Sequence, residues 1–293
     1  AHIFDETFEN PEKKGEFTIS LARQWKNAKL TGFLLPRAEL PFHPKPHSRL
    51  SLYGPTETSL IVKNNNNLAN EQSTLQSGLR YEYFGKLKYF SFHFLQHIDT
   101  EAPLFAVDEQ TSAITALYFE TNELGFTSQF EWNKYQFNIE AVHKSYYDYD
   151  LVSTAIGQLA PKNHTLISLG SHGQFNLKSK KTLSAFAELQ KVLGLSKEQS
   201  AEQYLFQSDI YLGLKLDFNN QKETALTFGA IKDFEKDSEN IFELDLSTRI
   251  SKKMRLSSLI RLIDATPKRD PNISPLQRLH NTNFLKISII SNI

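Results

Sequence analysis

The sequence has no cysteine, so its 293 residues can form neither a disulfide framework nor a thiolate metal site. It also has no run of eighteen or more apolar residues, which excludes a membrane span made of one apolar helix. Lys plus Arg and Asp plus Glu both total 33, so no field of one sign attracts nucleic acid or an acidic partner. At 293 residues the chain can form one large β domain or two smaller ones.

Apolar and polar residues alternate with a period of two along most of the chain. In the segment 210–218, the even positions are apolar and the odd positions are polar or small. Such alternation places one set of side chains on each face of a β-sheet. The same pattern returns at 226–230, 242–250, 254–262 and 285–293. Repeated strands with one apolar face predict either a soluble sandwich or a membrane barrel whose apolar face meets lipid.

A barrel accommodates the composition. The mean hydropathy of −0.42 is that of a soluble protein, but only every second residue of a barrel strand meets lipid. The 22 Phe and 11 Tyr residues suit a lipid-facing band with aromatic girdles. We therefore predict an all-β fold, an antiparallel transmembrane β-barrel, that occupies residues 1–293 as a single domain.

The alternation assigns a face to each side chain. The predicted lipid-facing residues are Phe90, Phe92, Phe94, Leu212, Leu214, Leu216, Leu244, Leu246, Ile287 and Ile289. The predicted lumen-facing charged residues are Lys215, Asp217, Glu243, Asp245, Arg249, Arg255 and Arg261. The aromatic residues predicted at the membrane interfaces are Trp25, Trp132, Tyr146, Tyr147 and Tyr149. The lumen charges either sort ions and polar solutes or fill the interior with salt bridges.

The predicted strands are separated by short and long breaks in turn, as in outer-membrane barrels. They cover 17–24, 29–35, 74–84, 88–98, 112–132, 135–145, 151–160, 164–175, 204–218, 223–233, 240–250, 254–264 and 282–293. Residues 1–15 are irregular, and 36–73 form a long outer loop whose prolines exclude strand pairing in its first half.

One segment, 178–203, shows helical spacing. Its apolar residues recur at Leu183, Phe186, Leu189 and Val192, and Ser196 with Gln199 forms a capping pattern. We predict one helical loop insertion between strands at 178–203.

In these features the chain resembles bacterial outer-membrane β-barrels, in particular porin-like and alginate-export-like barrels. The resemblance rests on the amphipathic hairpins from Gln203 onward, on the terminal strand 283–293 and on Leu30–Pro41 (LTGFLLPRAELP), a strand that runs into a proline-rich loop. It implies a place in the outer membrane of a Gram-negative bacterium, outer-membrane lipid as the surrounding partner, and passage of a polar solute. A closed structural barrel within a complex of envelope proteins is the alternative function.

Residues with catalytic or metal-binding chemistry form no recognisable motif. His43 and His47 flank two prolines that exclude a helix, so solvated loop histidines are favoured over metal ligands. Ser171 and His172 are neighbours on a strand and point to opposite faces, so they form no nucleophile–base pair. We predict no catalytic residue, no metal and no cofactor.

The last expectation concerns the number of strands. About thirteen strands is an odd number, whereas single-chain bacterial barrels have even numbers, with both termini on the periplasmic side. We therefore expect the chain to be the C-terminal part of a larger barrel, completed by a second chain or an upstream segment. A hairpin hidden at Asn122–Glu123 is the alternative explanation.

Overall fold

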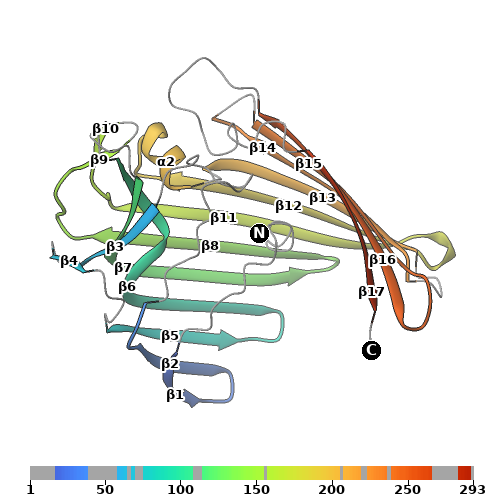
Figure 1. Ribbon diagram of the computed structural model, residues 1–293. Coiled ribbons are helices and arrows are strands. Elements are labelled where there is room, and N and C mark those ends of the chain that lie inside the picture. The colour runs from blue at the N-terminus through green and yellow to red at the C-terminus, as the bar shows by residue number, and fades with distance from the viewer. Residues whose placement is uncertain are drawn as a thin grey trace. The chain divides into compact units, whose positions relative to one another are not determined.

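The computed structural model describes most of the chain as strands (Figure 1). The described residues are 17–38, 58–64, 67–69, 75–107, 114–154, 157–204, 207–218, 223–235, 239–265 and 283–291. They divide into two compact units, of which unit 1 holds 1–82, 92–124 and 144–163 and unit 2 holds 83–91, 125–143 and 164–293. The prediction of an all-β, mainly antiparallel protein is confirmed.

Unit 2 is an antiparallel meander in which each strand pairs with the next one in sequence. Its strands are β11 (His164–Asn176), β12 (Thr182–Leu193), β13 (Ser208–Asp217), β14 (Ala225–Asp233), β15 (Glu239–Arg249), β16 (Met254–Ala265) and β17 (Phe284–Ser291). The short helices are η1 (Lys178–Lys180) and α2 (Lys197–Gln203). Consecutive antiparallel strands need no crossover connection between them.

The register of unit 2 aligns like residues into rows across the sheet. Leu214 lies opposite Phe228, which lies opposite Leu244, and the row continues through Ile260 to Leu285. A slip of one residue in any pair would move a whole strand of leucines to the other face. The hydrophobic pattern therefore specifies the register.

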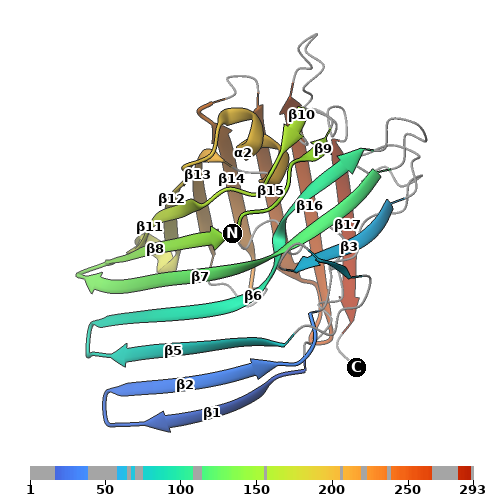
Figure 2. The ribbon, with the colours of Figure 1, turned by 90° about the vertical axis from the view of Figure 1, so that its left-hand side faces the viewer.

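Unit 1 contains the N-terminal hairpin and the longest strands. β1 (Ile19–Gln24) pairs antiparallel with β2 (Ala28–Leu35), and Figure 2 shows them side by side. The other strands that begin in it are β3 (Thr58–Asn64), β4 (Asn67–Ala69), β5 (Gln76–Phe84), β9 (Val152–Thr154) and β10 (Gly157–Leu159). β6 (Lys88–Val107), β7 (Ile114–Trp132) and β8 (Tyr135–Tyr146) are shared between the two units.

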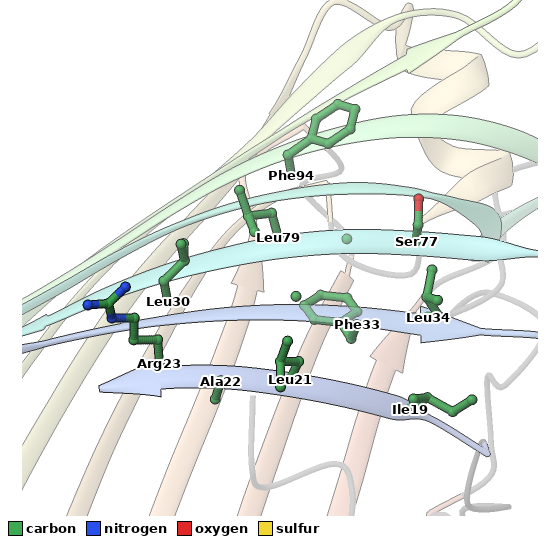
Figure 3. Close-up of a pocket in the computed structure, with 12 residues that line it drawn as sticks. Ile19, Leu21, Ala22, Arg23, Leu30, Phe33, Leu34, Ser77, Leu79 and Phe94 are labelled. Atoms are coloured by element: carbon green, nitrogen blue, oxygen red, sulfur yellow. The ribbon is translucent and has the colours of Figure 1, made fainter. Parts of the chain in front are cut away.

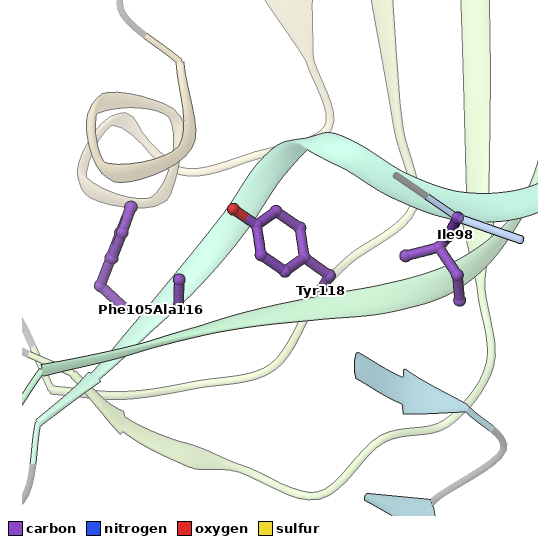
Figure 4. Packing of buried hydrophobic residues seen from close by; sticks show 5 residues of the cluster. Ile98, Phe105, Ala116 and Tyr118 are labelled. Carbon is purple, nitrogen blue, oxygen red and sulfur yellow. The ribbon is translucent and has the colours of Figure 1, made fainter. Parts of the chain in front are cut away.

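The C-terminal part of β6 and the N-terminal part of β7 are buried on both faces. Ile98, Ala116 and Tyr118 belong to one buried cluster, with Ala38 and Phe105 (Figure 4). The adjacent positions in sequence, such as Leu117 and Phe119, belong to a second buried cluster that includes Leu104 and Tyr149. Further along β7, Leu124 and Trp132 are exposed. One strand thus changes from a two-sided core to a sheet with an exposed apolar face.

The structure corrects the predicted long loops. The break between the predicted strands 88–98 and 112–132 is strand up to Val107, because β6 continues beyond Ile98. β7 runs without interruption from Ile114 to Trp132, so no hairpin lies at 122–123. The predicted loop 36–73 contains β3 and β4, in its part after the last proline, and β3 pairs parallel with β7 (Figure 2). The predicted strand 151–160 is a hairpin of the two short strands β9 and β10.

The predicted helical insertion 178–203 is wrong for most of its length, because residues 182–193 form β12. In its place Leu183, Ala185, Ala187 and Leu189 share one face, and β12 pairs with both β11 and β13. Phe186 produced the apparent helical spacing. It lies on the opposite, mostly polar face, where its ring stacks on His172 with centroids 4.6 Å apart.

The predicted cap at Ser196 is confirmed. α2 begins there, and the Ser196 hydroxyl accepts a hydrogen bond from the backbone N–H of Gln199 at 3.3 Å.

The pairings among the described residues do not close the strands into a barrel: β1 pairs with β2, and β17 pairs with β16. Within the same residues, no helix is both long enough and apolar enough to traverse a bilayer. The structure thus shows a mainly antiparallel sheet that is not closed into a barrel.

Candidate functional site: the polar face of the strands

Leu212, Leu214 and Leu216 lie on one face of the unit 2 sheet, which we call its apolar face. The residues that alternate with them along the strand lie on the other face, which we call the polar face. All seven predicted lumen charges lie on the polar face, because each alternates with an apolar-face residue of the same strand. They are Lys215, Asp217, Glu243, Asp245, Arg249, Arg255 and Arg261. The structure brings most of them into pairs.

Glu243 and Arg261 form the most buried of these pairs. They lie directly opposite each other on β15 and β16, and the Arg261 guanidinium donates hydrogen bonds to the Glu243 carboxylate. Arg261 is 2% exposed and its guanidinium also lies 5.3 Å from the centre of the Phe284 ring. The charge-assisted bond and the ring together compensate part of the cost of burial.

Two glycines lie in the cross-strand row that contains Glu243, and they leave space on the polar face. Phe186 lies opposite Gly213, Gly213 opposite Gly229, and Gly229 opposite Glu243. A Cβ atom on Gly213 would lie 2.3 Å from the Tyr211 hydroxyl oxygen, so glycine leaves the space that the phenol occupies. The polar face here carries an aromatic ring, a phenol and an ion pair at one level of the strands.

The charges nearer the short turns are more exposed. Arg249 and Arg255 lie opposite each other, and Glu223 accepts from both, at N–O distances of 2.7 and 2.8 Å. Lys215 and Asp217 approach to 3.4 Å. These pairs are open to solvent and carry little stability each, but they keep the polar face hydrated.

At the other end of the strands, three acidic side chains form a lateral row. Asp209 of β13 lies opposite Asp233 of β14, and Glu239 begins β15 beside it. All three are buried. Their burial side by side brings like charges together on the polar face. The sequence contains these residues, but only the register shows that they meet.

Unit 1 has a buried polar network that the sequence reading missed. The Lys144 ammonium donates to both carboxylate oxygens of Asp99 at 3.0 Å, and it also lies 3.0 Å from Glu101. The Tyr146 hydroxyl donates a hydrogen bond to the Asp99 carboxylate. Burial by itself would raise the pKa of Asp99, but Lys144 and Tyr146 hold that pKa below its usual value.

A second unit 1 cluster links two histidines to one carboxylate. His93 Nε2 lies 3.0 Å from one Glu123 oxygen, and His97 Nε2 lies 3.3 Å from the other. The two histidines are four apart on a strand, so they share a face, and each approaches a different oxygen. Among the described residues, no group of three or more His, Cys, Asp or Glu side chains is arranged to hold a metal ion.

The predicted lipid-facing residues lie on exposed faces of their strands. The most exposed large apolar side chains among them are Phe92, Phe94, Leu212, Leu214, Leu244, Leu246, Ile287 and Ile289. Leu214, in the middle of β13, is 47% exposed. Phe90 instead stacks on Tyr83 with ring centroids 4.9 Å apart.

The predicted interface aromatics separate into two groups. Trp25 and Trp132 are exposed at hairpin turns, as expected. Tyr149 departs from the prediction: its ring is buried against Phe119, and its hydroxyl donates to the backbone oxygen of Glu120. Of these three tyrosines, Tyr149 is therefore part of the core, because Phe119 in the N-terminal part of β7 packs against it.

The remaining chemical candidates give no catalytic arrangement. His172 stacks on Phe186, on the face away from Ser171, as the strand geometry requires. His43 and His47 lie outside the described residues.

Comparison with known proteins gave no matching family model and no matching curated sequence.

Proposed function

We propose that this chain forms an outer-membrane β-barrel of a Gram-negative bacterium that passes polar solutes. One observation carries the proposal: the sheet exposes its leucines, isoleucines and phenylalanines and keeps its charged residues on the opposite face. A protein in water does the reverse, because contiguous exposed apolar patches beyond a few hundred Å² are rare in soluble monomers.

The lengths of the strands support a membrane crossing. A transmembrane β-strand needs about 9–11 residues at the usual tilt. β13 has 10 residues, β14 has 9 and β15 has 11. In β7 the exposed apolar part runs from Leu124 to Trp132, and the part before it has a two-sided core. This change along one strand is what a boundary between lipid and water demands.

The polar face supplies the solute path in this proposal. Lys215, Arg249 and Arg255 each keep more than two fifths of their side-chain surface exposed, at 43%, 42% and 45%. Their carboxylate partners give the face both signs of charge, which favours hydrated ions and polar molecules over apolar ones. The proposal assigns no catalytic residue and needs no cofactor.

Two measurements test the proposal. Folded barrels migrate differently on a gel before and after boiling, and a channel conducts ions in a planar bilayer. We expect heat-modifiable migration and conductance, and we expect Arg255→Gln to shift the ion selectivity toward cations. Lys253→Gln is the matched control, since it removes the same charge from an exposed turn. A protein that stays monodisperse in buffer without detergent would refute the proposal.

A closed structural barrel that scaffolds other envelope proteins is the second candidate. Two buried clusters and the Asp99–Lys144 network in unit 1 favour it, because they make that part of unit 1 a packed core and not an open lumen. Heat-modifiable migration without conductance, together with stable co-purification of other proteins, would select this candidate over the channel.

A further inference from the structure

Arg23 is a charged side chain on an otherwise apolar face of the N-terminal hairpin. It shares that face with Ile19 and Leu21 of β1, and it lies opposite Leu30 of β2. Arg23 is exposed, and among the described residues no carboxylate pairs with it. Its guanidinium carbon lies 5.4 Å from the centre of the Trp25 ring, in the turn that follows β1. An exposed cation at the end of an apolar surface is available to an anion from outside the described chain.

A hollow of about 720 Å³ adjoins Arg23 on this face. Its apolar walls are Ile19, Leu21, Leu30, Leu34, Leu79 and Phe94. Gly32 creates the space, because a Cβ atom placed on it would meet no other atom within 4 Å. Figure 3 shows Leu30, Leu79 and Phe94 projecting from three strands on one side, with Arg23 at one end of the group.

We propose that this hollow binds an acyl chain of one anionic phospholipid, whose phosphate contacts Arg23. The assignment rests on the proposed membrane location of the chain. The apolar walls select a hydrocarbon chain, and the guanidinium selects the phosphate by a charge-assisted hydrogen bond. Trp25 marks the level of the headgroups, where its amphipathic ring is most stable.

The geometry favours a lipid over another occupant. The cation lies at one end of the hollow, at the turn, and the apolar walls continue from it along the strands. A phospholipid has the same arrangement, with one charge at one end of an apolar chain. A second copy of this chain would bring its own Arg23 to the same place if the hollows faced each other, and the two cations would repel.

The two tryptophans provide a direct test, since Trp25 and Trp132 are the only ones in the sequence. With Trp132→Phe, the fluorescence of the purified full chain reports on Trp25 alone. The protein is reconstituted into phosphatidylcholine vesicles that contain a tenth of either brominated phosphatidylglycerol or brominated phosphatidylcholine. We expect the anionic brominated lipid to associate beside Trp25 about fivefold more strongly, the factor expected for one basic side chain near an anionic lipid.

Arg23→Gln should abolish this preference, and Gly32→Leu should reduce quenching by both lipids because it fills the hollow. Ser20→Leu is the matched control for added volume, since Ser20 lies on the opposite face of β1. The Trp25→Phe protein, which reports on Trp132, should be unaffected by Arg23→Gln. Both variants are first checked for heat-modifiable migration, so a folding failure is recognised separately.

Any of the following outcomes would refute the proposed lipid site. Equal quenching by the two lipids at Trp25, or a preference that survives Arg23→Gln, would show ordinary bilayer contact and leave the membrane proposal intact. Quenching at Trp132 but not at Trp25 would show that protein covers the hollow. Absence of quenching at both tryptophans, without heat-modifiable migration, would refute the proposed function itself.

Discussion

Replacing Leu214 with arginine separates the environments that the apolar face of unit 2 can have. Leu214 lies at the middle of β13, 47% exposed, with Phe228 directly opposite it on β14. An arginine on the lipid face of a barrel costs about 2–4 kcal/mol near the bilayer midplane. On a face in water the same change costs within about 0.5 kcal/mol.

The matched control is Thr227→Arg. Thr227 lies on β14 opposite Lys215, on the polar face, at nearly the same level of the strands. An arginine there meets water and the existing charges, so we expect only a small effect. The control has the same new side chain and differs only in the face that receives it.

The assay is urea unfolding of both variants in phosphatidylcholine vesicles, followed by tryptophan fluorescence. We expect Leu214→Arg to lower the free energy of unfolding by about 2–4 kcal/mol, which is roughly a thirty- to several-hundred-fold change in the folding equilibrium. Equal effects of the two variants would refute the assignment of the faces. If the wild type folds in buffer without detergent and Leu214→Arg unfolds it there, the apolar face is instead the core of a soluble protein.

Three further predictions concern the buried charges. Glu243→Gln leaves Arg261 buried without its anion and should cost about 3–5 kcal/mol in the same unfolding assay; replacing both with apolar residues should recover most of the loss, and a failure to recover would contradict the pairing. Lys144→Met should destabilise by a similar amount, because Asp99 then stays buried as an unpaired carboxylate, and a neutral result would show that water reaches it. Asp209 is buried opposite Asp233, with Glu239 beside them, so repulsion among these acidic side chains should destabilise the folded state at neutral pH. Asp209→Asn should relieve this repulsion and raise the free energy of unfolding at pH 8, and a variant no more stable than the wild type at that pH would contradict it.

The sequence determined the all-β class, most hairpins and which residues of β13 to β17 share a face. The reason is that the side-chain period of a strand is two, so alternation read from 210–218 or 254–262 assigns faces without any knowledge of neighbours. It also located the turn at Trp25 and the helix cap at Ser196, which depend only on local backbone and hydrogen bonds.

Local patterns failed where tertiary packing overrides them. The spacing of Leu183, Phe186 and Leu189 fits a helix, but pairing with strands on both sides makes 182–193 a strand, and the ring of His172 accommodates Phe186 on the polar face. The distal part of β6 shows no clean alternation because both of its faces are covered. A strand buried on both sides has no polar face for a sequence pattern to display.

Only the tertiary structure decided which charges meet. Glu243 and Arg261 are 18 residues apart in the sequence, and its alternation places them on a common face. Asp99 and Lys144 are separated by 45 residues. Alternation specifies the face of a residue but not its level along the strand, and the register sets that level through the packing of whole apolar rows. The same holds for the hollow beside Arg23: Gly32 is visible in the sequence, but the hollow forms only where side chains of β1, β2, β5 and β6 come together.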